Sequence, residues 1–168
     1  MANNVIEPSN LGRSQIEELA EMFANRTGFI PCKTDIYKYV KSLGGKFNYT
    51  FDNLDSNGGS INVVDAHNFT INLSHATSPK RDIFTIAHEL GHFVLHSKLG
   101  KIKITAQRSS DINDAEREAN SFASAFLMPK GMVKEQFKML DGNVSDMAEL
   151  FNVSILAMTW RCKNLKLI

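Results

Sequence analysis

The residues best suited to chemistry lie in His88-Glu89-Leu90-Gly91-His92, a segment of the form H-E-x-x-H. In a helix, His88 and His92 lie one turn apart on one face, so both imidazoles can bind the same metal ion. Glu89 follows His88 by about 100° of rotation and borders the site without competing for the metal. This spacing predicts a metal site with Glu89 as its catalytic base.

The chemistry of such a site favours zinc. A hydrolytic zinc ion takes three protein ligands and keeps one position for water, whose pKa falls to about 7. A carboxylate beside that water can accept its proton during attack on a carbonyl and return it to the leaving amine. We therefore expect Zn²⁺ as the cofactor and amide hydrolysis as the reaction, although the ligand types also suit Mn²⁺ or iron.

The third ligand must come from further along the chain. His96 lies about 12 Å along the helix axis from His88, so we expect it outside the ligand set, as an outer hydrogen-bonding or packing residue. Glu116 and Glu118 are the two candidate ligands. Glu116 is favoured because Asn120, one turn later on its face, can hold the far nitrogen of a ligand imidazole. Glu118 stays open as the alternative.

The motif needs a helix, and its flanks predict a buried one. Ser78 followed by Pro79 is typical of a helix start, with serine as the N-cap and proline in the first turn. Unpartnered His and Glu side chains inside an apolar helix would cost several kcal/mol, which favours ligand and base roles for them. The apolar residues around the motif are Ile83, Phe84, Ile86, Ala87, Leu90, Phe93, Val94 and Leu95.

Other helices are expected as scaffold. Residues 1–10 read as a loose terminus, and apolar residues recur at helical spacing in residues 14–25 and 35–43. A further helix is predicted to start at Asp114 and to end at Met128-Pro129, and another over residues 134–140.

Alternating apolar residues predict strands in residues 47–51, 61–64 and 69–73. We expect a small three-stranded antiparallel sheet next to the H-E-x-x-H helix. An edge strand there could hold an extended peptide across the zinc. The predicted fold class is therefore α+β, a mainly helical metallopeptidase domain.

The group that stabilises the oxyanion is left open by the residues alone. His67 and His75 lie at predicted strand ends, and Arg81 begins the motif helix. A tyrosine or backbone amides could serve equally well.

The composition excludes several classes of protein. Nineteen basic and eighteen acidic residues give a net charge of +1, so no strong field favours nucleic acid or an anionic membrane. Cys32 and Cys162 are too few for a disulfide framework. No leader or long apolar run is evident, which predicts a cytoplasmic protein without membrane attachment.

Residues 143–168 read as helix, turn and Ser154-capped helix, similar to a helix-turn-helix. We expect a metallopeptidase domain over residues 1–142, with residues 143–168 packed on it as a subdomain. Arg161, Lys163 and Lys166 make DNA binding the minor alternative. Docking of a substrate protein, or completion of the core, is favoured.

Two blocks of sequence resemble the ImmA/IrrE family of metallopeptidases. The first is residues 81–92 with His96, and the second is residues 116–123 followed by Leu127-Met128-Pro129. Members are cytoplasmic zinc peptidases of bacteria, mobile elements and phages that typically cleave a helix-turn-helix repressor encoded nearby. The resemblance implies metal binding by His88, His92 and a glutamate of the second block. One departure, Phe126-Leu127 where two leucines are usual, affects packing.

Two functional hypotheses follow. The first is a zinc endopeptidase that makes a site-specific cut in a helix-turn-helix repressor and so derepresses mobile-element, phage or stress-response genes. The alternative is a metal-stabilised regulator, an antirepressor or DNA-binding protein, that acts by binding alone.

Overall fold

The computed structural model describes residues 6–51, 59–107 and 113–168. Within them the fold is α+β and mainly helical, as predicted. The elements in chain order are α1 (Arg13–Thr27), α2 (Ile36–Ser42), β1 (Gly45–Thr50), β2 (Gly59–Asp65), β3 (Asn68–Ser74), α3 (Pro79–Gly91), the π-helical turn η1 (His92–His96), β4 (Ile104–Gln107), α4 (Asp114–Leu127), α5 (Lys130–Met139), α6 (Val144–Leu150) and α7 (Ile155–Asn164).

The sheet differs from the predicted three-stranded antiparallel one. It has four strands in the order β1-β3-β2-β4, and β1 runs parallel to β3 while the other two pairings are antiparallel. β3 alternates fully between buried and half-buried residues, so it can serve as a central strand with a partner on each side. β1 and β2 therefore flank β3, with β1 running parallel to it and β2 antiparallel.

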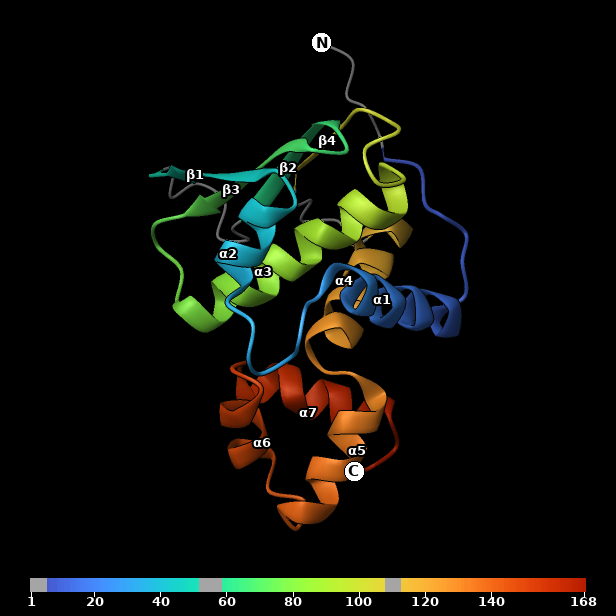
Figure 1. Ribbon diagram of the computed structural model, residues 1–168. Helices are drawn as coiled ribbons and strands as arrows, with labels where there is room; N and C mark the ends of the chain where they lie inside the picture. The colour runs from blue at the N-terminus through green and yellow to red at the C-terminus, as the bar shows by residue number, and fades with distance from the viewer. Residues whose placement is uncertain (1–5, 52–58, 108–112) are drawn as a thin grey trace.

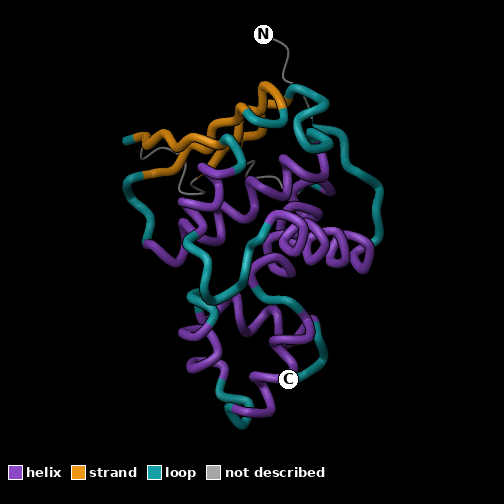
Figure 2. The backbone as a smooth tube through the Cα atoms, in the orientation of Figure 1, coloured by secondary structure: helices purple, strands orange, loops and turns teal. Residues whose placement is uncertain are grey.

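The sheet, α3 and α4 form successive layers (Figure 1). The sheet covers one side of α3 and of η1, and the rings of Phe69 in β3 and Phe93 in η1 stack at 4.5 Å. Helix α4 packs along another side of α3, and α1 packs on α4. Figure 2 shows the strands gathered at one end of the molecule and α5, α6 and α7 at the other. The second half of helix α3 thus lies in the core, and its polar side chains Thr85, His88 and Glu89 are buried.

One buried arginine joins the C-terminal helices to the rest. Arg161 of α7 is fully buried and donates hydrogen bonds to the carbonyl oxygen of Met128 and to Glu17 of α1, each at 2.9 Å. Helices α6 and α7 are separated by four residues, and Ser154 caps α7. The division at residue 142 into two units stays a prediction.

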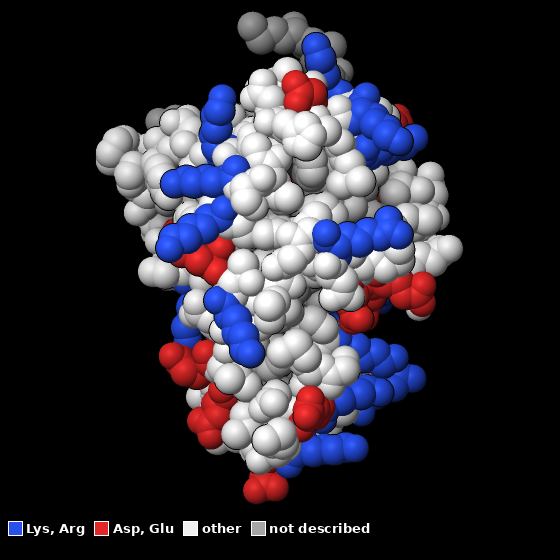
Figure 3. Space-filling model, viewed as in Figure 1, with Lys and Arg blue, Asp and Glu red and all other residues white. Residues whose placement is uncertain are grey.

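Charges of both signs are scattered over the face drawn in Figure 3. This distribution fits the net charge of +1. Among the described residues, no helix has the length and apolar character needed to cross a membrane.

Candidate metal centre

Helix α3 and the η1 turn that continues it carry His88 and His92 of the H-E-x-x-H segment into the core. Helix α3 begins as predicted, with the Ser78 hydroxyl accepting from a first-turn amide and Pro79 in the first position. His88, Glu89 and His92 are at most 1% exposed. The two buried imidazoles require polar partners, and α4 supplies Glu116 and Asn120.

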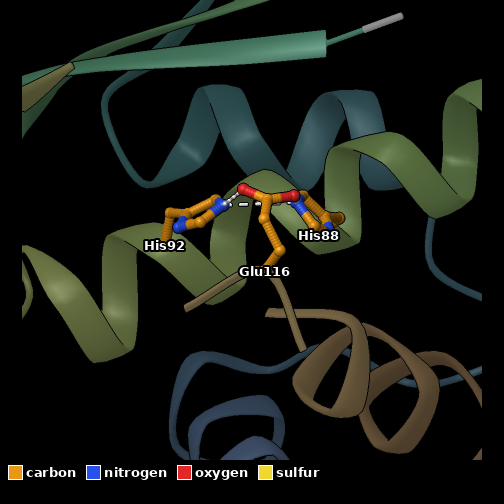
Figure 4. A group of neighbouring side chains, drawn as sticks. All are labelled: His88, His92 and Glu116. Carbon is orange, nitrogen blue, oxygen red and sulfur yellow. Dashed lines mark hydrogen bonds and ion pairs between the residues drawn. The ribbon is translucent and has the colours of Figure 1, made fainter. Parts of the chain in front are cut away.

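Helix α4 brings Glu116 to the two imidazoles (Figure 4). The side chain of Asn113 caps this helix by accepting from the amide of Glu116 at 3.0 Å. The two helices cross closely at Gly91, where a Cβ atom would lie 3.1 Å from the Cα and carbonyl oxygen of Ala119. Glycine at this position therefore lets α4 approach closely enough for Glu116 to reach His88 and His92.

The three candidate ligands form a compact triangle. The Nε2 atoms of His88 and His92 lie 3.2 Å apart, and the Glu116 oxygens lie 3.2 Å from the first and 3.1 Å from the second. A tetrahedral zinc ion with bonds of about 2.0–2.1 Å separates its ligand atoms by about 3.3 Å. The two imidazoles and the carboxylate therefore fit zinc in donor type and in spacing.

The charge of Glu116 also suits a ligand. Burial alone would raise the pKa of its carboxyl, but the adjacent imidazoles of His88 and His92 outweigh burial and lower that pKa well below its usual range. Glu116 is thus held as a carboxylate, the form that binds a metal.

Asn120 lies where the sequence places it, one turn after Glu116. Its Oδ1 atom is 2.9 Å from Nδ1 of His88. An amide oxygen can only accept, so the proton sits on Nδ1 and the lone pair of Nε2 faces the centre of the triangle.

His96 lies outside the triangle but contacts His92. The π-helical turn, marked by the amide of Ser97 donating to the carbonyl oxygen of His92 at 3.0 Å, carries His96 into the same buried region. The Nδ1 atoms of His92 and His96 lie 2.9 Å apart, and Nε2 of His96 lies 2.9 Å from Glu118. Burial lowers the pKa of His96, which favours a neutral ring with one donor and one acceptor nitrogen.

Glu118 determines the direction of this chain of hydrogen bonds. Because its carboxylate only accepts, His96 donates from Nε2 and accepts at Nδ1 from His92, which leaves the Nε2 lone pair of His92 for a metal. The backbone amides of Ser9 and Asn10 also donate to Glu118, at 2.8 and 3.0 Å. Burial would raise the pKa of Glu118, but these amides and His96 lower it overall.

The structure places Glu116, and not Glu118, beside both imidazoles, and the choice of Glu116 as the third ligand stays a prediction. Sequence reasoning missed the contribution of Ser9 and Asn10, because backbone amides leave no signal in residue type. It also treated residues 1–10 as loose, whereas Ser9 and Asn10 are held against α4.

Glu89 lies under the start of β2. A Cβ atom at Gly59 would lie 3.0 Å from Oε1 of Glu89 and would clash with Thr85. Gly59 therefore leaves the space that the Glu89 carboxylate occupies.

The oxyanion candidates lie on the surface. His67 is exposed in the β2–β3 turn, and the exposed ring of His75 stacks on Phe51 at 4.2 Å. Arg81 is exposed in the first turn of α3. None of the three shares the burial of the candidate ligands, so their proposed role stays a prediction.

The chain is similar to known proteins in sequence and in fold. Residues 47–163 match the model of the IrrE N-terminal-like domain. The chain is 34% identical over 71 residues to Metallopeptidase ImmA of Bacillus subtilis (strain 168), a match that spans 42% of each protein. It also resembles a solved Mycobacterium tuberculosis transcriptional regulator, with a TM-score of 0.61 and 19% identity over 89% of this chain and 46% of that one. The second likeness is one of fold.

Proposed function

The chain belongs to the ImmA/IrrE family through its IrrE N-terminal-like domain, a metallopeptidase domain, and on this premise we propose that it is a zinc-dependent endopeptidase. The observation that carries the proposal is the buried triangle of His88, His92 and Glu116 with Glu89 on the adjacent residue of α3. His88, His92 and Glu116 would hold the zinc ion.

Bound zinc supplies an acidified water and a polarised substrate carbonyl. Glu89 accepts the proton of the attacking water on its carboxylate and delivers it to the nitrogen of the leaving amine. Asn120 and His96 fix the protonated nitrogens of His88 and His92, so that both Nε2 lone pairs point inward. Burial of these groups keeps bulk water from competing for their hydrogen bonds.

The arrangement of the sheet suits a protein substrate. β4 is an edge strand, and its pairing with β2 begins at Ser60, the residue after Gly59, which itself lies over Glu89. An extended substrate segment can add to such an edge by backbone hydrogen bonds. We infer that the substrate is a helix-turn-helix repressor cut at one site, as the family resemblance implies, in the cytoplasm of a bacterium.

The test is cleavage of the repressor encoded beside this chain, with Glu89→Gln as the key variant. We expect the wild type to make one cut and Glu89→Gln to lose turnover by a factor of about 10² or more while still binding zinc. Glu135→Gln, on the exposed face of α5, is the matched control and should cut normally. Equal cleavage by Glu89→Gln and the wild type would overturn the assignment of the base.

The alternative is a regulator that binds without cutting. The paired helices α6 and α7 favour it, because their arrangement is similar to a helix-turn-helix. The exposed face of α7 carries the large apolar side chains of Leu156 and Trp160, which suit a protein partner better than a DNA groove. Derepression that survives in Glu89→Gln would select this alternative.

A further inference from the structure

A groove of about 640 Å³ lies between α3, α4 and α7, and its lining includes none of the three candidate metal ligands. Phe84 of α3 and Leu156 and Trp160 of α7 supply its large apolar side chains. Leu156 and Trp160 are 67% and 58% exposed. Large apolar side chains that line a concave surface and remain this exposed are typical of an interaction site.

The groove is positively charged. Its lining includes Arg13, Lys80 and Arg81 and contains no carboxylate. Two of its serines, Ser78 and Ser154, are the N-caps of α3 and α7, so the positive ends of two helix dipoles also border it. These features favour a partner that carries negative charge.

Existing ion pairs do not block such a partner. Lys80 contacts Glu149 at 2.6 Å and Arg13 contacts Glu17 at 3.2 Å. Ion pairs at the surface contribute about 1 kcal/mol or less, so carboxylates of a docked partner can replace or share these contacts.

The shape of the groove favours a helix over an extended segment. Its walls are helices, whose backbone groups are already paired, so an extended peptide would find no strand edge there. The short side chains of Ser121 and Ser124 lie one turn apart on α4 and leave room for a helix to approach.

We propose that this groove docks an acidic amphipathic helix of the protein substrate. Asn120 lines the groove and also holds Nδ1 of His88, so a helix bound here lies beside the candidate metal centre. The groove would thereby add affinity and selectivity away from the scissile bond. The identification of the partner as a substrate rests on the proposed function, whereas the docking itself does not.

The test uses a fluorescein-labelled helical peptide of about 18 residues, with leucine at positions i, i+3, i+4 and i+7 and glutamate elsewhere. Its binding to the full chain carrying Glu89→Gln is measured by fluorescence anisotropy. We expect saturable binding, and at least about tenfold weaker binding of a peptide with lysine in place of glutamate.

Two neighbouring variants provide a matched comparison. Leu156→Asp should weaken binding by about tenfold or more, whereas Ile155→Asp, at an exposed position that does not line the groove, should leave it unchanged. Both positions are exposed, so both variants should fold. Equal binding of the two peptides, equal effects of the two substitutions, or no binding would each overturn the proposal.

The two proposals fail separately. Peptide binding is measured in the Glu89→Gln background, so it does not depend on catalysis. If the wild type cuts no protein, the proposed peptidase function fails while the peptide result stands. If the peptide does not bind while the wild type cuts the repressor, only the docking proposal fails.

Discussion

The close crossing of α3 and α4 predicts the effect of Gly91→Ala. The added Cβ would lie 3.1 Å from the Cα and carbonyl oxygen of Ala119 and 3.2 Å from the Cβ of Phe122. Two of these three atoms are backbone, so relief requires α4 itself to move by a few tenths of an ångström. Glu116 lies on α4 and would move with it.

Two opposing effects set the magnitude. Replacing a glycine within a helix by alanine stabilises it by roughly 0.5–1 kcal/mol. Overpacking a tight contact costs about 1–3 kcal/mol, and here the rigid backbone of Ala119 prevents easy relief. We therefore expect a net loss of about 1–2 kcal/mol in the free energy of unfolding, or roughly 2–8 °C in Tm for a chain of this size.

Zinc affinity should fall as well. Zinc sites require ligand distances within about 0.2 Å, so displacement of Glu116 should weaken zinc binding by roughly tenfold. Urea unfolding of the metal-free protein measures the change in the free energy of unfolding, and competition with a chelator measures the change in zinc affinity.

Gly131→Ala is the matched control. Gly131 lies in α5, and a Cβ there would meet no atom within 4 Å. It should be neutral or slightly stabilising, with unchanged zinc affinity. If Gly91→Ala behaved in the same way, the role assigned to the close helix crossing would be refuted.

Three further predictions test the surroundings of the site. Glu118→Ala removes the acceptor for His96 and for the amides of Ser9 and Asn10, so zinc affinity should fall by about 10–100-fold and hydrogen exchange of both amides should accelerate. The control Arg117→Ala, at an adjacent exposed position, should change neither quantity. Normal zinc affinity in Glu118→Ala would contradict the hydrogen-bond chain. Gly59→Ala should lower the rate of cleavage and leave zinc affinity intact, because the added Cβ displaces Glu89 and touches no candidate ligand. Loss of zinc binding together with cleavage would contradict this separation of base from ligands. Burial alone would raise the pKa of Glu17, but Arg161 and Arg13 lower it overall, so this carboxylate stabilises the fold above about pH 4.5 and the stabilisation is lost as the pH falls. Urea titrations should therefore show a smaller loss of stability on acidification in Glu17→Gln than in the wild type. Equal acid sensitivity of the two proteins would exclude Glu17 as a contributor.

The local features of this chain were predictable from its sequence. Helical period and capping located α3 and α4, because apolar spacing and the Ser78-Pro79 start act within a few residues. The same period places Glu116 and Asn120 on one face of α4, and the structure brings that face to the two histidines. Their role as metal ligand and outer partner stays a prediction.

Features that depend on distant segments were not predictable in this way. The parallel pairing of β1 with β3 depends on which strand occupies the centre of the sheet. The alternation of apolar and polar residues along a strand is the same whether its neighbour runs parallel or antiparallel, so the sequence pattern does not distinguish the two arrangements. The π-helical turn at His92 shifts His96 in a way that regular helical spacing does not show. The contacts from Ser9 and Asn10 to Glu118 join residues more than 100 positions apart through backbone amides.

Metal content and coordination of the purified protein test the central claim most directly. X-ray absorption together with elemental analysis should show one zinc ion per chain, with two imidazole nitrogens at about 2.0–2.1 Å and one carboxylate oxygen at about 2.0–2.2 Å. Stoichiometric zinc should be lost in both His88→Ala and Glu116→Ala. Protein without stoichiometric metal, or zinc that remains fully bound in both variants, would contradict the account.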